Sequence, residues 1–230
     1  MNQVTEGHSI RRYDGELREL HYKVLEMGTL VLTQVKEAVR SLKTGDVSLA
    51  AEIIEEDDQV DDLEVEADTE VVALFARRCP KGSDLRLVMA LSKAITDLER
   101  VGDEAVKIAS CVERLYAVPA DYPAEVPRNQ VLVLADLVVK RFESALRIVD
   151  SWEAEQAQQF IASQREVSER FQQTLGGLMD NGGSDAGGAN RAVNLVLLLK
   201  ALERIACHAE NLAEYVIYQA MGLVIRHPAV

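Results

Sequence analysis

The amino-acid sequence repeats itself, and this repeat constrains the fold more than any other feature. The segment LERVGDEAVKIA at residues 98–109 recurs as LERIACHAENLA at residues 202–213. A motif duplicated at this distance indicates two homologous halves. Upstream, residues 33–60 align with residues 140–167 without a gap, and both segments carry the same apolar pattern. We therefore predict that each half contains the same three helices in the same order.

The two halves differ in length at one connection. In the gapless alignment, equivalent residues are 107 positions apart, as Ala38 and Ala145 are, whereas the LER segments are 104 positions apart. The change in offset falls at one equivalent connection, which is the proline-containing segment 77–84 in the first half and the glycine-rich segment 180–190 in the second half. Loops tolerate such changes in length, so the difference leaves the helical repeat intact.

Composition and apolar spacing predict an all-α protein. Hydrophobic residues make up 48% of the chain but aromatic residues only 5%, which is typical of helix packing. Residues Thr44, Gly45 and Asp46 provide a helix stop followed by an N-cap, and Asp84 is placed to cap the third helix. The expected helices span roughly residues 17–42, 47–76, 85–116, 129–150, 153–179 and 189–225.

This pattern divides the chain into four parts. We expect a flexible N-terminus at residues 1–16, a first three-helix repeat at 17–118, and a second at 129–230. A linker at 119–128 separates the repeats, and three prolines within it make it stiff. The predicted architecture is two tandem, pseudo-symmetric three-helix bundles.

The charge and the cysteines restrict partners and compartment. A net charge of −13 argues against nucleic acid as a partner, because phosphates require clustered lysine and arginine. Three scattered cysteines without CxxC spacing indicate a reducing compartment. No apolar run approaches the roughly 18 residues of a membrane span, and the polar N-terminus has no signal core. We expect a cytoplasmic protein that does not insert into a membrane.

Carboxylates follow one face of the second predicted helix and flank the apolar face of the third. The acids on these two helices are Asp57, Asp61, Glu64, Asp68, Glu99 and Asp103. Antiparallel packing can bring the two acidic faces together, and since like charges repel, a multivalent cation would stabilise them. Oxygen ligands suit Mg, Ca, Mn or iron better than a structural zinc ion. The alternative interpretation is a solvated helix face.

The second half offers a softer set of candidate ligands. Glu203, Cys207 and His208 could bind zinc or ferrous iron, although a lone cysteine in such a helix is also typical of a small buried hydrophobic residue. Gln164 and Ser168 stand where the first half has aspartates. Ferritin-like dinuclear sites require a histidine three residues after a glutamate, and no histidine in this chain meets that requirement. We therefore expect any metal to favour the first half.

Three segments of the first half carry a resemblance to a known family. They are DDQVDDLE at 57–64, RRCPKGSDLRLVMA at 77–90 and ITDLERVGDEAVKIA at 95–109, and they resemble the PhoU family of phosphate-uptake regulators. The resemblance implies metal clusters held by an E(D)xxxD motif on each bundle. In this sequence the motif maps onto Asp57 with Asp61 and Glu99 with Asp103, while only Glu203 is retained in the second half. Iron, manganese, magnesium and zinc, as divalent or ferric ions, remain open.

The same resemblance implies a function. PhoU proteins act as negative regulators of the phosphate-starvation response, and they couple a phosphate ABC transporter, through its ATPase subunit, to a sensor histidine kinase. They are adaptors rather than enzymes, and they often form homodimers. The competing hypotheses are a metal-dependent phosphoester hydrolase and a purely structural helical adaptor.

Overall fold

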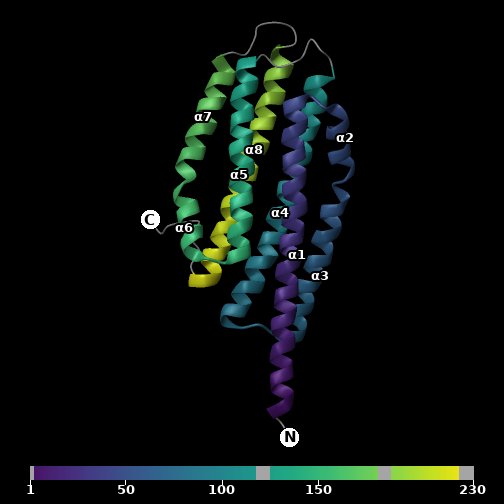
Figure 1. Ribbon diagram of the computed structural model, residues 1–230, viewed down its shortest axis with the longest axis vertical. Helices are drawn as coiled ribbons and strands as arrows, with labels where there is room; N and C mark the ends of the chain where they lie inside the picture. Colours follow the sequence, from purple (N-terminus) through teal and green to yellow (C-terminus); the bar gives the residue numbers. More distant parts are fainter. Residues whose placement is uncertain (1–2, 118–124, 181–187, 223–230) are drawn as a thin grey trace.

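The structure, a computed structural model, describes residues 3–117, 125–180 and 188–222 of the chain. Within these ranges it contains eight α-helices and no strand, so the predicted all-α fold is confirmed. The helices lie along one elongated body, with those of the first half on one side and those of the second half on the other (Figure 1). They are α1 (Gln3–Thr44), α2 (Val47–Glu55), α3 (Asp58–Arg78), α4 (Gly82–Tyr116), α5 (Glu125–Ser151), α6 (Ala154–Ala162), α7 (Gln164–Asp180) and α8 (Gly188–Met221).

The middle helix of each half is broken, which corrects the single helices predicted for 47–76 and 153–179. In the first half the chain turns at Glu56 and Asp57, within four consecutive acids. In the second half it turns at Ser163, whose hydroxyl donates to the Phe160 carbonyl at 2.7 Å and competes with the helical backbone. The two breaks are equivalent in the repeat, so the halves share this irregularity.

Two predicted helix ends differ from the structure. Helix α1 begins at Gln3, so most of the segment expected to be a flexible N-terminus is helical. Helix α4 begins at Gly82 after Lys81, which places Asp84 in the first turn instead of at the cap. The negative charge of Asp84 in this first turn still interacts favourably with the positive end of the helix dipole. The predicted cap at Asp46 is confirmed, because its carboxylate accepts the Leu49 N–H at 3.1 Å.

The connection between the halves lies largely outside the described residues. Pro119 and Pro123, two of the three linker prolines, belong to the undescribed segment 118–124. Helix α5 already begins at Glu125, so Pro127 occupies a first helical turn, where proline is tolerated. Residues 181–187, the greater part of the glycine-rich connection, likewise lie outside the described residues.

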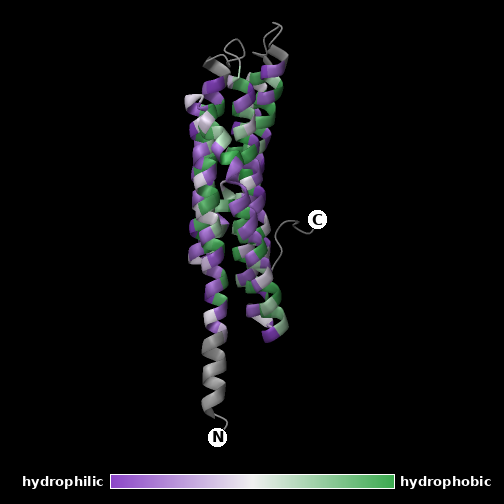
Figure 2. Ribbon diagram, turned by 90° about the vertical axis from the view of Figure 1, so that its right-hand side faces the viewer, coloured by the Kyte–Doolittle hydropathy of each residue, from purple (hydrophilic) through white to green (hydrophobic). Residues whose placement is uncertain are grey.

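Helices α4 and α8 pack against each other in antiparallel orientation and join the two halves. Arg86 on α4 donates to the Gln219 carbonyl on α8 at 3.0 Å, while at the other end Arg114 donates to Asn194 at 2.9 Å. Leu91, Leu98 and other apolar side chains of the predicted stripes are fully buried. Figure 2 shows hydrophobic and hydrophilic residues alternating along the helices, as amphipathic packing requires. No helix in the described ranges is long and apolar enough to cross a membrane.

Candidate functional site

The structure brings the predicted acids of the first half together where α3 packs against α4. We define the acidic cluster as Asp57, Asp61, Glu64, Glu99 and Asp103. Asp57 experiences the negative charges of Asp61 and Asp103, and Glu99 experiences those of Asp103, Glu64 and Asp61. Asp61 and Asp103 are exposed, whereas the other three are half-buried. The cluster therefore borders the core, as the sequence pattern predicts.

Burial and mutual repulsion both act on these carboxyls. Burial, followed by the charges of Asp61 and Asp103, raises the pKa of Asp57 above its usual range. Burial and neighbouring acids likewise raise the pKa of Glu64 and of Glu99, and Arg100 offsets only part of either increase. The charged forms are therefore destabilised in the folded chain, and a cation bound here would relieve that cost.

A close approach of α1 to α4 forms the floor of the acidic cluster. The Gln34 side chain on α1 is buried, and its amide interacts with the Asp57 carboxylate, where it acts to lower the pKa of that acid. A Cβ added at Gly102 on α4 would lie 3.4 Å from Gln34 Oε1 and 3.6 Å from Asp57 Oδ1. Gly102 therefore lies directly beneath the Gln34 amide and the Asp57 carboxylate, and both side chains are within contact distance of it.

The donor chemistry of the acidic cluster suits a hard cation. Carboxylates together with the Gln34 amide oxygen are the ligands such ions prefer. Among the described residues, only Asp103 of the cluster has an ion-pair partner, Lys107 at 3.6 Å. The side chains are not drawn into a closed shell, since no three acids, histidines or cysteines in the described ranges are gathered at metal-binding distances. The negative charge and the oxygen donors of the acidic cluster therefore suit a cation, although its carboxylates are spread along two helices.

The second half carries a cation of its own at the equivalent position. Arg141 occupies the place of Gln34 in the repeat. Its guanidinium is buried, donates to Ser163 Oγ at 2.9 Å and to the Phe160 carbonyl at 3.2 Å, and lies 4.0 Å from the Phe160 ring centre. Burial lowers the pKa of Arg141 from its usual value, against the effect of Glu210. The fixed positive charge of Arg141 beside Ser163 opposes binding of a metal ion, in addition to the missing carboxylates.

The softer ligand set of the second half is not gathered around one point. His208 faces α4, where its Nδ1 lies 2.7 Å from Asp97 Oδ1. Glu203 accepts a hydrogen bond from Lys200 at 2.5 Å. Cys207 is exposed, which corrects the alternative of a buried hydrophobic residue. Partial desolvation and the charges of Glu203 and Glu210 raise the pKa of this thiol, so it is a poor thiolate donor.

A buried acid that the sequence analysis did not single out connects the two halves. Asp97 on α4 accepts hydrogen bonds from three α8 side chains: His208 Nδ1 at 2.7 Å, Asn211 Nδ2 at 3.2 Å and Tyr215 OH at 2.5 Å. Burial acts to raise the pKa of Asp97, but these hydrogen bonds and the histidine outweigh it, so the pKa is lowered. We call these four side chains the Asp97 network.

Spacing could have revealed this network. Asp97 and Glu104 lie seven residues apart on the same face as Ala94, Val101 and Ile108, where each neighbour is apolar and buried. An acid on an apolar helical face requires a buried partner. The sequence shows an acid on an apolar helical face, but the side chains that bind Asp97 lie more than a hundred residues away in the sequence.

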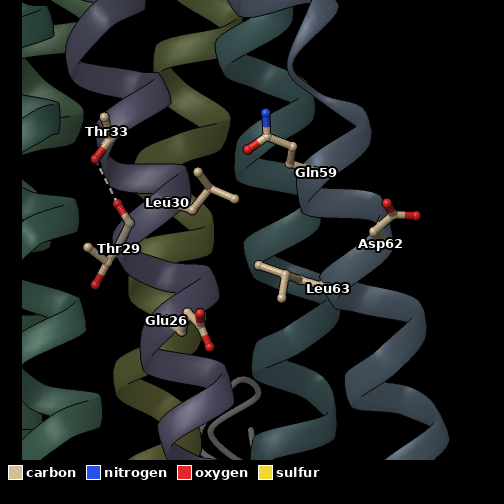
Figure 3. A pocket seen from close by; sticks show the side chains of 7 residues that line it. All are labelled: Glu26, Thr29, Leu30, Thr33, Gln59, Asp62 and Leu63. Carbon is tan, nitrogen blue, oxygen red and sulfur yellow. Dashed lines mark hydrogen bonds between the residues drawn. The ribbon is translucent and has the colours of Figure 1, made fainter.

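A groove lies between α1 and α3, beside the acidic cluster. This groove of about 700 Å³ is lined by Glu26, Thr29, Leu30, Thr33, Gln59, Asp62 and Leu63. Figure 3 shows Leu30 and Leu63 pointing toward one another across it. Thr29 and Thr33 donate their hydroxyl hydrogens to carbonyls of their own helix at 2.8 and 3.0 Å. The groove thus combines an apolar centre with acids at its edges.

Comparison with known proteins identifies relatives over nearly the full chain. The family model described as PhoU domain matches residues 24–112 and 131–216. The phosphate-specific transport system accessory protein PhoU homolog of Pseudomonas aeruginosa is 36% identical over 96% of this chain and 90% of its own length. The crystal structure of PhoU from that organism superposes with a TM-score of 0.85 at 34% identity, covering 92% of this chain and 100% of that one. A regulatory protein PhoU from Streptococcus pneumoniae has the same fold, with a TM-score of 0.84 at 23% identity and coverage of 94% and 100%.

Proposed function

We propose a regulatory role for this chain, which belongs to the PhoU family. It acts as a cytoplasmic accessory protein of phosphate transport that represses uptake and starvation signalling when phosphate is plentiful. The observation that carries this proposal is the match to a phosphate-specific transport accessory protein over 96% of the chain. In this role it bridges the ATPase subunit of a phosphate ABC transporter and a sensor histidine kinase without catalytic turnover.

The groove between α1 and α3 supports such bridging. Its apolar centre at Leu30 and Leu63, with Glu26 and Asp62 at its edges, suits an amphipathic helix that carries lysine or arginine beside its apolar face. The excess of negative charge over the whole chain favours the same kind of partner. We propose that the groove contacts the transporter or the kinase. Assembly into a homodimer stays a prediction, which light scattering of the purified chain would check.

Deleting the gene in its native cell is expected to switch on phosphate-starvation genes in phosphate-rich medium. The effect should disappear when the transporter or the kinase is also absent, because a bridge has no output without its partners. A starvation-responsive reporter measures it. Complementation with Asp62→Lys should fail, whereas Glu169→Lys, on the exposed part of α7, should restore repression. Unchanged reporter expression in the deletion strain would contradict the regulatory role, and sustained phosphoester turnover by the pure chain would favour the hydrolase alternative.

We also propose that the acidic cluster holds metal ions, with Asp57, Asp61, Glu99 and Asp103 as ligands. The ion would neutralise these carboxylates and connect α3 to α4. Three observations support the proposal: the raised pKa values of Asp57 and Glu99, the buried Gln34 amide beside Asp57, and the scarcity of cations around the cluster in the described ranges.

Neutralising two acids should stabilise the metal-free chain and remove its metal. Because the folded pKa values of Asp57, Glu64 and Glu99 are raised, the contribution of these three carboxyls to stability is greatest below their unfolded pKa values and is lost as pH rises through the folded ones. The Asp61→Asn, Asp103→Asn double variant should therefore raise the melting temperature in EDTA by about 1–3 °C at pH 7. Elemental analysis should show metal lost in this variant and retained in Glu203→Gln. The reverse pattern would move the site to the second half.

A further inference from the structure

A second groove lies between α4 and α8, and its charge is opposite to that of the chain as a whole. It measures about 320 Å³ and is lined by Glu104, Lys107, Cys111, Arg114, Leu197, Lys200, Ala201 and Arg204. Four of these eight side chains are cationic and one is acidic, in a protein with a net charge of −13. We call it the basic groove. Cationic side chains concentrated in a concave surface attract anions more strongly than isolated surface charges do.

The internal repeat shows what the basic groove lacks. Because the LER segments are related by 104 positions, Ala201 is the counterpart of Asp97, and the groove is the pseudo-symmetric counterpart of the Asp97 network. Glu104, Lys107 and Cys111 then correspond to His208, Asn211 and Tyr215, which bind the Asp97 carboxylate. The remaining equivalent pairs are Arg114 with Tyr218, Leu197 with Lys93, Lys200 with Thr96 and Arg204 with Arg100. One end of the α4–α8 pair therefore contains the buried Asp97 carboxylate, whereas the equivalent position at the other end is a groove lined by cationic side chains.

The cations of the basic groove are held in place. Glu104 is buried and accepts hydrogen bonds from Lys107 at 3.0 Å and from Arg204 at 2.9 Å. Arg114 donates to Asn194 Oδ1 at 2.9 Å and contacts Cys111 Sγ at 3.3 Å. Among the ion pairs of the described ranges, none gives Arg114 a carboxylate partner. Its remaining N–H groups are therefore available to a ligand.

Other acids near the groove do not cancel its charge. Asp103 lies 3.6 Å from Lys107, and Glu203 lies 2.5 Å from Lys200. Asp103, Glu203 and Glu104 are three acids against four cations, so one positive charge remains, and it belongs to Arg114, which has no carboxylate partner among the described ion pairs. The Asp97 carboxylate is bound by an imidazole, an amide and a phenol, whereas this groove offers two guanidinium and two ammonium groups. Such groups favour a ligand with more negative charge than a single carboxylate.

We propose that the basic groove binds a small phosphate-type oxyanion, which takes the position that the Asp97 carboxylate holds at the other end. Arg114 and Arg204 bind the oxyanion through their N–H groups, and Lys107 and Lys200 balance its charge. This proposal does not rest on the regulatory role, since binding is a property of the purified chain.

Titration calorimetry of the full chain with inorganic phosphate tests the proposal. EDTA and constant ionic strength exclude binding through metal and general screening. Saturable binding is expected, and Ala201→Asp should abolish it because it installs the carboxylate that the counterpart carries. Arg114→Gln should weaken binding about tenfold, since a hydrogen bond to a charged group is lost. Arg165→Gln, which removes an exposed cation on α7, should leave it unchanged.

Two further outcomes would overturn the proposal. One is the absence of phosphate binding, or binding that persists equally in Ala201→Asp and Arg114→Gln chains that circular dichroism shows to be folded. The other is displacement of phosphate by acetate as effectively as by sulfate, because the groove is expected to prefer a tetrahedral dianion over a monocarboxylate. If Ala201→Asp does not fold, the comparison of Arg114→Gln with Arg165→Gln decides.

Discussion

Replacing Asp97 with alanine is expected to lower the melting temperature of the chain by about 10 °C at pH 7. The change removes a buried carboxylate that accepts three hydrogen bonds from α8, and leaves His208, Asn211 and Tyr215 without their acceptor. Breaking a buried, hydrogen-bonded charge costs about 3 kcal/mol or more, and each kcal/mol corresponds to about 2–4 °C in a chain of this size. Thermal unfolding followed by circular dichroism measures it.

The pH dependence separates this network from an ordinary packing defect. The folded pKa of Asp97 is lowered, so its contribution to stability is present above the unfolded aspartate value of about 4 and is lost as pH falls through the folded value. The difference between wild type and Asp97→Ala should therefore shrink in strong acid. Asp68→Ala, on the exposed face of α3, is the control and should cause no loss. Equal melting temperatures for Asp97→Ala and wild type would show that the two halves are held together by apolar packing alone.

Local patterns were sufficient to predict most of the fold. The repeated LER segments and the apolar spacing identified the helices of both halves, because helix faces follow from residues three and four positions apart. The breaks at Asp57 and Ser163 were not predicted, since apolar periodicity continues across each of them. Whether a helix of this length bends depends on single side chains such as the Ser163 hydroxyl, and hydropathy does not register them.

The candidate sites required contacts between distant parts of the sequence. The acidic cluster was predicted because its acids lie on neighbouring helices at helical spacing. Gln34 was missed because it comes from α1, and only the tertiary packing places it beside Asp57 and Gly102. The basic groove was missed because its cations are dispersed over two helices about a hundred residues apart. With the pairing of α4 and α8 known, the repeat makes both the Asp97 network and its altered counterpart evident.

Exchanging Gln34 for arginine is expected to abolish the response of the first half to metal. Arg141 shows that the equivalent position of this fold accepts a buried guanidinium. An arginine at position 34 would place a permanent positive charge beside Asp57 and supply the neutralisation that we assign to the metal. Mn²⁺ at a hundred times its dissociation constant should stabilise the wild-type chain by about 2.7 kcal/mol, or roughly 5–10 °C. In Gln34→Arg this increase should disappear.

The neutral variant Gln34→Met is the matched control for this charge. It has a similar volume and no charge, so it should retain most of the increase caused by Mn²⁺, reduced only by the loss of one amide oxygen. Arg141→Gln should create no response in the second half, because Gln164 and Ser168 still stand in place of carboxylates. An undiminished Mn²⁺ effect in a folded Gln34→Arg chain would separate the metal from the acidic cluster, since a cation cannot bind with undiminished affinity beside a fixed charge of the same sign.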